Sequence, residues 1–402
     1  MPVQPSTELK LTRKARLRGR VMTAKSASDN KQGLIDVLVR TEIRAIASYH
    51  VPDSSGLLKL DAMENPNPWP GPLQAEWQQA LSLVEANRYP DPGGRAVKAG
   101  LRALMNLDEL SAESNQDIDI LLGNGSDEII QILAMALANP DRGIMAPEPG
   151  FVMYGMIAKF VGMPYVGVDL DENFDLDIDN FVAQVKVHNP ALIFLAVPNN
   201  PTGNVFSLEA IERVVEASDG LVVIDEAYIA FTDSDLLSLC AHYENVVVMR
   251  TLSKVGLAGL RLGFLMGRKA WLDEFDKVRL PYNINVLTQA SAEFALKNYD
   301  VLVAQTEALR DERSNLFNRL MQIETVEPFE SEANFILVRC LDKPARQVFE
   351  VMKTEGVLIK CLDGAHPLLT SCLRLTVGNR DDNERMIEAL TVALNGDGAT
   401  AE

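Results

Sequence analysis

Short apolar segments alternate with helical segments from Asn115 onward, and this alternation limits the possible folds of the chain more than any other feature. The apolar segments have the length of strands and are rich in aliphatic, often β-branched, residues; they span residues 118–122, 191–197, 221–224 and 246–249. Strands of this length that are separated by helices form crossover units in a parallel sheet. The pattern therefore predicts an α/β fold with a mostly parallel central sheet flanked by helices.

The pattern changes after Val301. A charged amphipathic helix is expected at residues 307–322, and short strands are expected at 334–338, 356–360 and 373–377. This predicts a second, smaller α+β domain. The expected divisions of the chain are an N-terminal arm with part of the small domain (35–90), a large domain (91–295), a C-terminal small domain (296–396) and a frayed tail (397–402).

The composition is that of a globular protein and excludes several classes of function. The 402 residues are 47% hydrophobic and carry a formal charge of −18, which argues against nonspecific binding of nucleic acid. No apolar run reaches the roughly 18–20 residues that span a bilayer, so no membrane role is expected. The four cysteines and four histidines show no spacing typical of metal ligands. We expect small-molecule partners, a cytoplasmic location and no metal.

The first 34 residues differ from the rest in charge. They carry a net charge of +6, so the remainder carries −24. They also lack sustained apolar periodicity, so they bury too little surface to offset the entropy of ordering, and we expect disorder there. Two alternatives stay open: an organelle transit peptide, or a true start at Met22.

A glycine-containing loop joins the first expected strand to a helix. Gly125, Ser126 and Asp127 follow that strand closely and precede an apolar helical segment. Backbone amides at the start of a helix bind phosphate, assisted by the helix dipole. The loop does not match the dinucleotide fingerprint, because Glu128 occupies the third glycine position. It is a candidate phosphate site, although such glycines also occur for structural reasons alone.

Polar side chains follow two further strands. Asp225 comes directly after the segment 221–224, and Asn200 follows the segment 191–197 in a loop stiffened by prolines. Ligands bind at the carboxyl edge of open α/β sheets, so both side chains are placed for binding. The carboxylate of Asp225 could pair with the protonated ring nitrogen of a pyridine-type cofactor. Asn200 and Tyr228 could hydrogen-bond to a phenolate oxygen on the same cofactor ring.

Lys254 follows the segment 246–249 and precedes several small residues. Most lysines are solvated surface charges, but this position favours a partly desolvated amine that forms a Schiff base with an aldehyde. Ser253 and Arg261 lie close enough in sequence to reach the phosphate expected at Gly125. These residues together suit one cofactor, pyridoxal 5'-phosphate.

The chain resembles the fold-type I pyridoxal-phosphate aminotransferases from about residue 43 to residue 394. The motifs that carry the resemblance are AMENP at 62–66, NRYP at 87–90, the Gly125 loop, PNNPTG at 198–203, DEAY at 225–228, the segment from Lys254 to Arg261 and CLRLTVG at 372–378. The resemblance implies the same α/β fold, with the cofactor in the large domain, and a homodimer.

The resemblance also implies roles for residues around the cofactor. Lys254 would bond to the cofactor covalently, Asp225 would meet its ring nitrogen, and Asn200 and Tyr228 would bind its phenolate oxygen. Tyr154 would stack on its ring. The phosphate would be held by Gly125, Ser126, Asp127, Ser253, Arg261 and the partner subunit's Tyr89.

Four residues are implied for the substrate. Arg374 matches an arginine that binds the substrate anion, and Asn65 and Tyr49 match residues near the substrate, although Tyr49 also suits simple packing. Lys360 stands where many relatives have a second arginine, so the charge is kept but the bidentate geometry is lost. The spacing from Lys254 to Arg261 is one residue shorter than usual, so either the turn is tighter or the arginine is placed differently.

The activity implied is transamination of L-histidinol phosphate with 2-oxoglutarate, a step of histidine biosynthesis. The partners would then be a small amino donor and a 2-oxo acid. Within the same fold, an aromatic or aspartate aminotransferase and a decarboxylase of a phosphorylated amino acid remain alternatives. A transcriptional regulator built on this fold is disfavoured, because residues 1–34 are too short for a DNA-binding domain.

Overall fold

The structure, a computed structural model, describes residues 27–48 and 51–396, which belong to two units divided after Val51. In the first unit, helices α2 (Ala27–Leu38) and α3 (Thr41–Arg44) are joined by an ion pair of 2.6 Å between Arg44 and Asp36. The disorder expected for residues 1–34 falls mainly outside the described residues, and its predicted boundary lies within α2. The tail 397–402 is also outside them.

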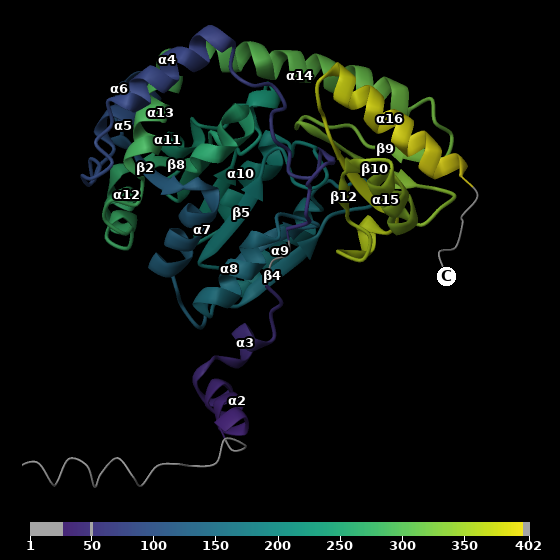
Figure 1. The fold of residues 1–402 in the computed structure, drawn as a ribbon. Helices are drawn as coiled ribbons and strands as arrows, with labels where there is room; N and C mark the ends of the chain where they lie inside the picture. The colour runs from purple at the N-terminus through teal and green to yellow at the C-terminus, as the bar shows by residue number, and fades with distance from the viewer. Residues whose placement is uncertain (1–26, 49–50, 397–402) are drawn as a thin grey trace, which may run out of the picture. The chain divides into compact units, whose positions relative to one another are not determined.

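A seven-stranded sheet forms the centre of the second unit (Figure 1). Its strand order is β2-β8-β7-β6-β5-β3-β4. The strands are β2 (Ile118–Asn124), β3 (Ile144–Glu148), β4 (Tyr165–Asp169), β5 (Leu192–Ala196), β6 (Leu221–Asp225), β7 (Val246–Thr251) and β8 (Leu262–Arg268). Only β8 runs antiparallel to its neighbours β2 and β7, so the expectation of a mostly parallel sheet is confirmed.

The central strands are apolar except at their carboxyl ends because both faces of the sheet are covered. Along β6, Val222 and Ile224 pack into one core, whereas Leu221 and Val223 pack into the core on the opposite face. The helices of this part are α4 (Gly71–Ser82), α5 (Arg95–Leu104), α6 (Leu107–Ser114), α7 (Gly125–Ala136), α8 (Met153–Val161), α9 (Ile178–His188), α10 (Leu208–Ala217), α11 (Leu239–His242), α12 (Lys269–Asp276) and α13 (Val286–Lys297).

A smaller α+β part follows, as expected. Its antiparallel sheet has the order β12-β13-β10-β9. The strands are β9 (Val326–Pro328), β10 (Phe335–Cys340), β12 (Lys360–Cys361) and β13 (Cys372–Thr376), and the helices are α15 (Ala345–Thr354) and α16 (Arg380–Asn395). The long helix α14 (Tyr299–Leu320) contacts both this part and the turn after β7, so it connects the two parts of the unit (Figure 1).

Several elements differ from the sequence-based expectation. The strand expected at 356–360 is two short strands, because β11 (Val357–Leu358) pairs with β1 (Leu58–Lys59) and the chain then moves to pair with β13 as β12. Strands β3, β4 and β8 were not predicted, since Pro147, Gly167 and Gly263 interrupt their apolar patterns. None of the described helices is both long and apolar enough to cross a membrane.

Candidate active site

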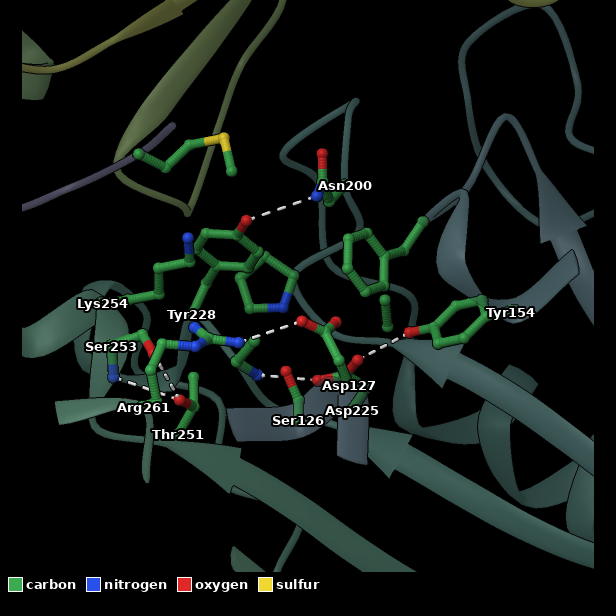
Figure 2. A pocket seen from close by; sticks show the side chains of 15 residues that line it. Ser126, Asp127, Tyr154, Asn200, Asp225, Tyr228, Thr251, Ser253, Lys254 and Arg261 are labelled. Atoms are coloured by element: carbon green, nitrogen blue, oxygen red, sulfur yellow. Dashed lines mark hydrogen bonds and ion pairs between the residues drawn. The ribbon is translucent and has the colours of Figure 1, made fainter. Parts of the chain in front are cut away.

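A cavity of about 560 Å³ lies at the carboxyl edge of the central strands (Figure 2). Nine of the residues expected at a cofactor line it: Ser126, Asp127, Tyr154, Asn200, Asp225, Tyr228, Ser253, Lys254 and Arg261. They come from the ends of β2, β5, β6 and β7 and from α8, so the parallel strands bring side chains that are distant in sequence to one edge. The structure therefore assembles one site from several separate motifs.

Lys254 lies in a tight turn directly after β7. The turn is a short π-helix (Ser253–Leu257), in which Gly256 has φ of 128° and so takes a conformation that favours glycine. The ammonium Nζ donates to the carbonyl of Ala62 at 3.1 Å and lies 5.6 Å from the ring centre of Tyr228. Burial lowers the pKa of Lys254 to about 8, and the neighbouring Arg374 contributes to this shift. A substantial fraction of this amine is therefore neutral near pH 8.

Asp225 ends β6 and is buried. Its Oδ2 accepts a hydrogen bond of 2.6 Å from the hydroxyl of Tyr154, and its Oδ1 accepts one of 3.1 Å from the backbone N–H of Ala227. Burial raises the pKa of Asp225 to about 6, while both hydrogen bonds oppose the shift. Near neutral pH the carboxylate is thus ionised, desolvated and ready for a cationic partner.

Tyr154 has different neighbours from those predicted. Its ring stacks on Phe194, with centroids 4.4 Å apart and planes 7° apart, and its hydroxyl is bonded to Asp225. Burial, followed by the charge of Asp225, raises the pKa of Tyr154 well above its usual value. One face of Tyr154 is thus covered by Phe194 and its polar end supports the carboxylate, while its stacking on a cofactor ring stays a prediction.

Phe151 lines the same cavity and was missed in the sequence. It packs edge-on against Tyr154, with centroids 5.5 Å apart at 85°. Its position three residues before Tyr154, just past the carboxyl end of β3, was the available signal, because ligands gather at that edge. Thr251 and Met63 also line the cavity without having been predicted.

The loop from β2 to α7 brings an arginine next to the start of a helix. Gly125 begins α7 with φ of 73°, and a Cβ placed there would lie 2.6 Å from Nη2 of Arg261. The same Nη2 is 3.0 Å from Oδ2 of Asp127. Close by, the hydroxyl of Thr251 donates a hydrogen bond of 2.9 Å to the hydroxyl oxygen of Ser253. Arg261 itself adopts a left-handed conformation with φ of 49°, and over the shortened spacing from Lys254 it still reaches the start of α7.

Asn200 connects two other predicted residues. Its Nδ2 donates to the hydroxyl oxygen of Tyr228 at 3.3 Å, and its Oδ1 accepts from Nη1 of Arg374 at 2.6 Å. Arg374 also donates to the carbonyl of Asp61 at 2.9 Å and lies over the ring of Phe335. Burial raises the pKa of Tyr228, so its hydroxyl keeps its proton at neutral pH. The three residues form one buried polar network behind the cavity.

The remaining predicted residues that the structure describes do not line the cavity. Asn65 donates from its amide to the carbonyl of Val255 and to Gln305, each at 3.1 Å, so it supports the turn after Lys254, and its substrate contact stays a prediction. Tyr89 is 82% exposed and stacks on Tyr282. Tyr49 lies outside the described residues.

Lys360 lies beside Arg374 in the small sheet. The two residues are directly opposite each other on the antiparallel strands β12 and β13. Opposite residues of neighbouring strands project from the same face, so two cationic side chains share one face there. Sequence spacing alone, with 13 residues between them, does not reveal this pairing.

The donor set of the cavity fits pyridoxal phosphate. Arg261 and the start of α7 suit the phosphate, and the ionised Asp225 suits a protonated ring nitrogen. Asn200 and Tyr228 offer hydrogen-bonding groups for a ring oxygen, and Lys254 offers an amine with a depressed pKa. The lack of a side chain at Gly125 lets the guanidinium of Arg261 approach the start of α7, where the phosphate would bind.

Comparison with known proteins identifies relatives over most of the chain. The family model for aminotransferase class I and II matches residues 56–390. Histidinol-phosphate aminotransferase 2 of Nitrosococcus oceani is 47% identical over 352 residues, which cover 88% of this chain and 96% of that protein. Histidinol-phosphate aminotransferase 1 of Burkholderia mallei is 49% identical over 358 residues, which cover 89% and 98%.

Solved structures have the same fold. The histidinol-phosphate aminotransferase of Sinorhizobium meliloti in complex with pyridoxal-5'-phosphate superposes with a TM-score of 0.77 at 22% identity, covering 88% of this chain and 96% of that one. The L-threonine-O-3-phosphate decarboxylase of Porphyromonas gingivalis has a TM-score of 0.71 at 20% identity, covering 84% and 99%. At these identities the likeness concerns the fold and does not separate the two reactions.

Proposed function

The chain belongs to the aminotransferase class I and II family, and on that premise we propose that it transfers the amino group of L-histidinol phosphate to 2-oxoglutarate, a step of histidine biosynthesis. The main evidence for this substrate is the 47–49% identity, over almost nine tenths of the chain, to proteins named histidinol-phosphate aminotransferase. The cavity supports the chemistry independently, because each group needed to hold pyridoxal phosphate is present.

Four contacts would hold the cofactor. Arg261, Ser253 and the first amides of α7 take the phosphate, Asp225 takes the ring nitrogen, and Asn200 with Tyr228 takes the ring oxygen. Phe151, which lines the cavity beside Tyr154, would offer an aromatic face to the ring. When bound, the cofactor supplies an electron sink that makes the hydrogen on the substrate's amino-bearing carbon acidic.

Lys254 moves that proton. Its Nζ reaches the cavity beside Tyr228, and its pKa of about 8 leaves enough neutral amine near neutral pH to accept a proton and later return it. The carbonyl of Ala62, 3.1 Å away, orients the amine when it is not bonded. Asp225 keeps the ring nitrogen protonated, and Tyr154 holds Asp225 in place.

The substrate anion is bound by Arg374 with Lys360. The amino donor presents a phosphate and the returning 2-oxo acid presents a carboxylate, and a guanidinium fork suits both anions. Arg374 is fixed by Asn200 and Asp61, so the fork is held in one orientation next to the residue that contacts the cofactor ring. Lys360, on the same face of the small sheet, adds a second positive charge.

A homodimer is part of this proposal, and so is a cytoplasmic location. Tyr89 is 82% exposed and stacked on Tyr282, which suits a phosphate contact to the other subunit better than one within its own cavity. Leu83 and Leu280 are exposed apolar side chains at 81% and 71%, as expected of a surface that becomes covered.

Substrate profiling tests the assignment. The loaded enzyme is given L-histidinol phosphate, aspartate, phenylalanine and L-threonine O-3-phosphate in turn, each with 2-oxoglutarate, while glutamate and carbon dioxide are measured. The proposal requires that kcat/KM is largest for L-histidinol phosphate and that no carbon dioxide is released. Preference for aspartate or phenylalanine would move the assignment to those aminotransferases, and carbon dioxide release would establish a decarboxylase.

A further inference from the structure

Three side chains with metal-binding groups meet outside the cavity described above. Glu148 ends β3, Asp169 ends β4, and His366 lies in the loop between β12 and β13. One ligand atom from each lies within 4.8 Å of the other two, and Nε2 of His366 is 3.3 Å from Oδ1 of Asp169. We infer that this cluster binds a divalent transition-metal cation, with Zn²⁺ as the best match.

The two carboxylates need a positive partner. Glu148 and Asp169 are directly opposite each other on neighbouring parallel strands, where like charges destabilise the pairing. Within the described residues 51–396, His366 is the one basic side chain at ion-pair distance from either carboxylate, and the whole chain carries −18. A divalent cation would compensate both charges at once, which a single histidine does not do in either protonation state.

The position of the Glu148 carboxylate depends on two neighbours. A Cβ on Gly167 would lie 2.4 Å from Cδ of Glu148, so the glycine leaves the space that this side chain occupies. The hydroxyl of Tyr165 hydrogen-bonds to Glu148, and burial, followed by the charge of this carboxylate, raises the pKa of Tyr165. Metal-binding carboxylates are oriented by such outer hydrogen bonds. The carboxylate is therefore positioned before any ion arrives.

His366 is held in one orientation as well. Its Nδ1 accepts a hydrogen bond of 3.3 Å from the backbone N–H of Leu368, so its proton lies on Nε2 and points to Asp169. A cation would take the place of that proton, and the ring proton would move to Nδ1 at the loss of this one long hydrogen bond. A histidine with two carboxylates is a ligand set that Zn²⁺ accepts, with water in the fourth position.

The site has a route for the ion. The side chain of Asp169 is 71% exposed, whereas that of His366 is 12% exposed, so the cluster opens to solvent on the aspartate side. An ion bound there would link β3 and β4 of the large sheet to the loop that separates Lys360 from Arg374. Because His366 lies 197 residues after Asp169, the spacing of histidines along the sequence gave no sign of this site.

Equilibrium dialysis of the full-length, cofactor-loaded chain against Zn²⁺, after removal of metal with a chelator, tests the inference. Wild-type protein should retain one Zn²⁺ per chain that both His366→Gln and Glu148→Gln lose, with affinity reduced at least tenfold. Tyr165→Phe, which keeps all three ligands, should weaken binding by about 10- to 100-fold. The matched controls are His188→Gln and Glu172→Gln, which alter exposed residues outside the cluster.

Thermal unfolding provides a second readout that does not depend on catalysis. Added Zn²⁺ should raise the Tm of wild type and of both controls but not that of His366→Gln, because a ligand stabilises only the folded state that binds it. Circular dichroism without metal verifies that the variants are folded. Retention of the Zn²⁺ equivalent by His366→Gln, or no Zn²⁺ bound by wild type, would overturn the inference whatever the substrate of the enzyme proves to be.

Discussion

The hydroxyl of Tyr154 donates a hydrogen bond of 2.6 Å to Oδ2 of Asp225, and both residues are buried at the carboxyl edge of the central sheet. The bond favours the ionised carboxylate, whereas burial favours the neutral one. Tyr154 is therefore a positioning residue for the group that meets the cofactor ring.

Replacing Tyr154 with Phe should shift the pH dependence of cofactor binding. In wild type, affinity should fall as the pH drops through about 6, where Asp225 becomes protonated. Without the hydrogen bond the pKa of Asp225 rises, so the fall should begin at a higher pH. The measurement is the dissociation constant of pyridoxamine phosphate across this range, with Tyr243→Phe as control, since Tyr243 is half-buried and does not line the cavity. Superimposable profiles of wild type and Tyr154→Phe would contradict the positioning role.

Asp225→Asn should stabilise the cofactor-free chain while destroying function. The folded pKa of about 6 lies above the unfolded value of 3.8, so the folded state binds the proton more tightly and loses stability as the pH rises through this interval. At pH 7 the neutral variant should gain roughly 2–3 kcal/mol, a gain that disappears near pH 4. Urea unfolding at both pH values measures it, and equal stability at pH 7 would refute the burial penalty.

Lys254 should react with the cofactor in its neutral form. The rate of cofactor incorporation into the cofactor-free chain should rise with pH and level off above about 8, whereas a lysine of ordinary pKa continues to gain reactivity up to about 10.5. Borohydride reduction followed by peptide mapping identifies the bonded residue. Lys254→Ala should lose both the bond and turnover, and substantial remaining turnover would defeat the assignment.

Gly125→Ala should disturb the phosphate contact. The added Cβ would lie 2.6 Å from Nη2 of Arg261, and φ of 73° is unfavourable for alanine. We expect cofactor affinity to fall by at least tenfold, measured by fluorescence titration. Gly259→Ala is the matched control, because a Cβ there meets no atom within 4 Å. Equal losses in both variants would show that the effect is not specific to the phosphate loop.

Arg374→Lys should impair both half-reactions. The fork that joins Asn200, Asp61 and the substrate anion would be replaced by a single ammonium, and the loss of a charged hydrogen bond corresponds to about 10- to 100-fold in kcat/KM. The loss should be seen with L-histidinol phosphate and with glutamate alike. A loss with one donor only would mean that Arg374 does not serve both anions.

The sequence predicted the site residues well where a single polar residue follows the end of an apolar strand. Asp225, Asn200 and Lys254 each follow an apolar segment, and parallel strands place such residues at one edge, so their meeting was predictable. The shortened spacing from Lys254 to Arg261 left two arrangements open, since sequence spacing does not distinguish a contracted turn from a displaced arginine.

Other features depend on three-dimensional packing. Tyr154 and Phe151 are both aromatic, three residues apart and in the lining of the cavity, and only the structure shows that one face of Tyr154 is covered by Phe194. Lys360 meets Arg374 through strand register, and the antiparallel direction of β8 between β2 and β7 likewise depends on the three-dimensional arrangement. Such relationships leave no periodic signal in the sequence.

The most direct test of the proposed function is a single-turnover spectrum of the cofactor-loaded enzyme mixed with L-histidinol phosphate, without any 2-oxo acid. The account predicts rapid, stoichiometric conversion of the cofactor from its pyridoxal to its pyridoxamine form, reversed by 2-oxoglutarate. Conversion by aspartate or aromatic amino acids but not by L-histidinol phosphate would contradict it.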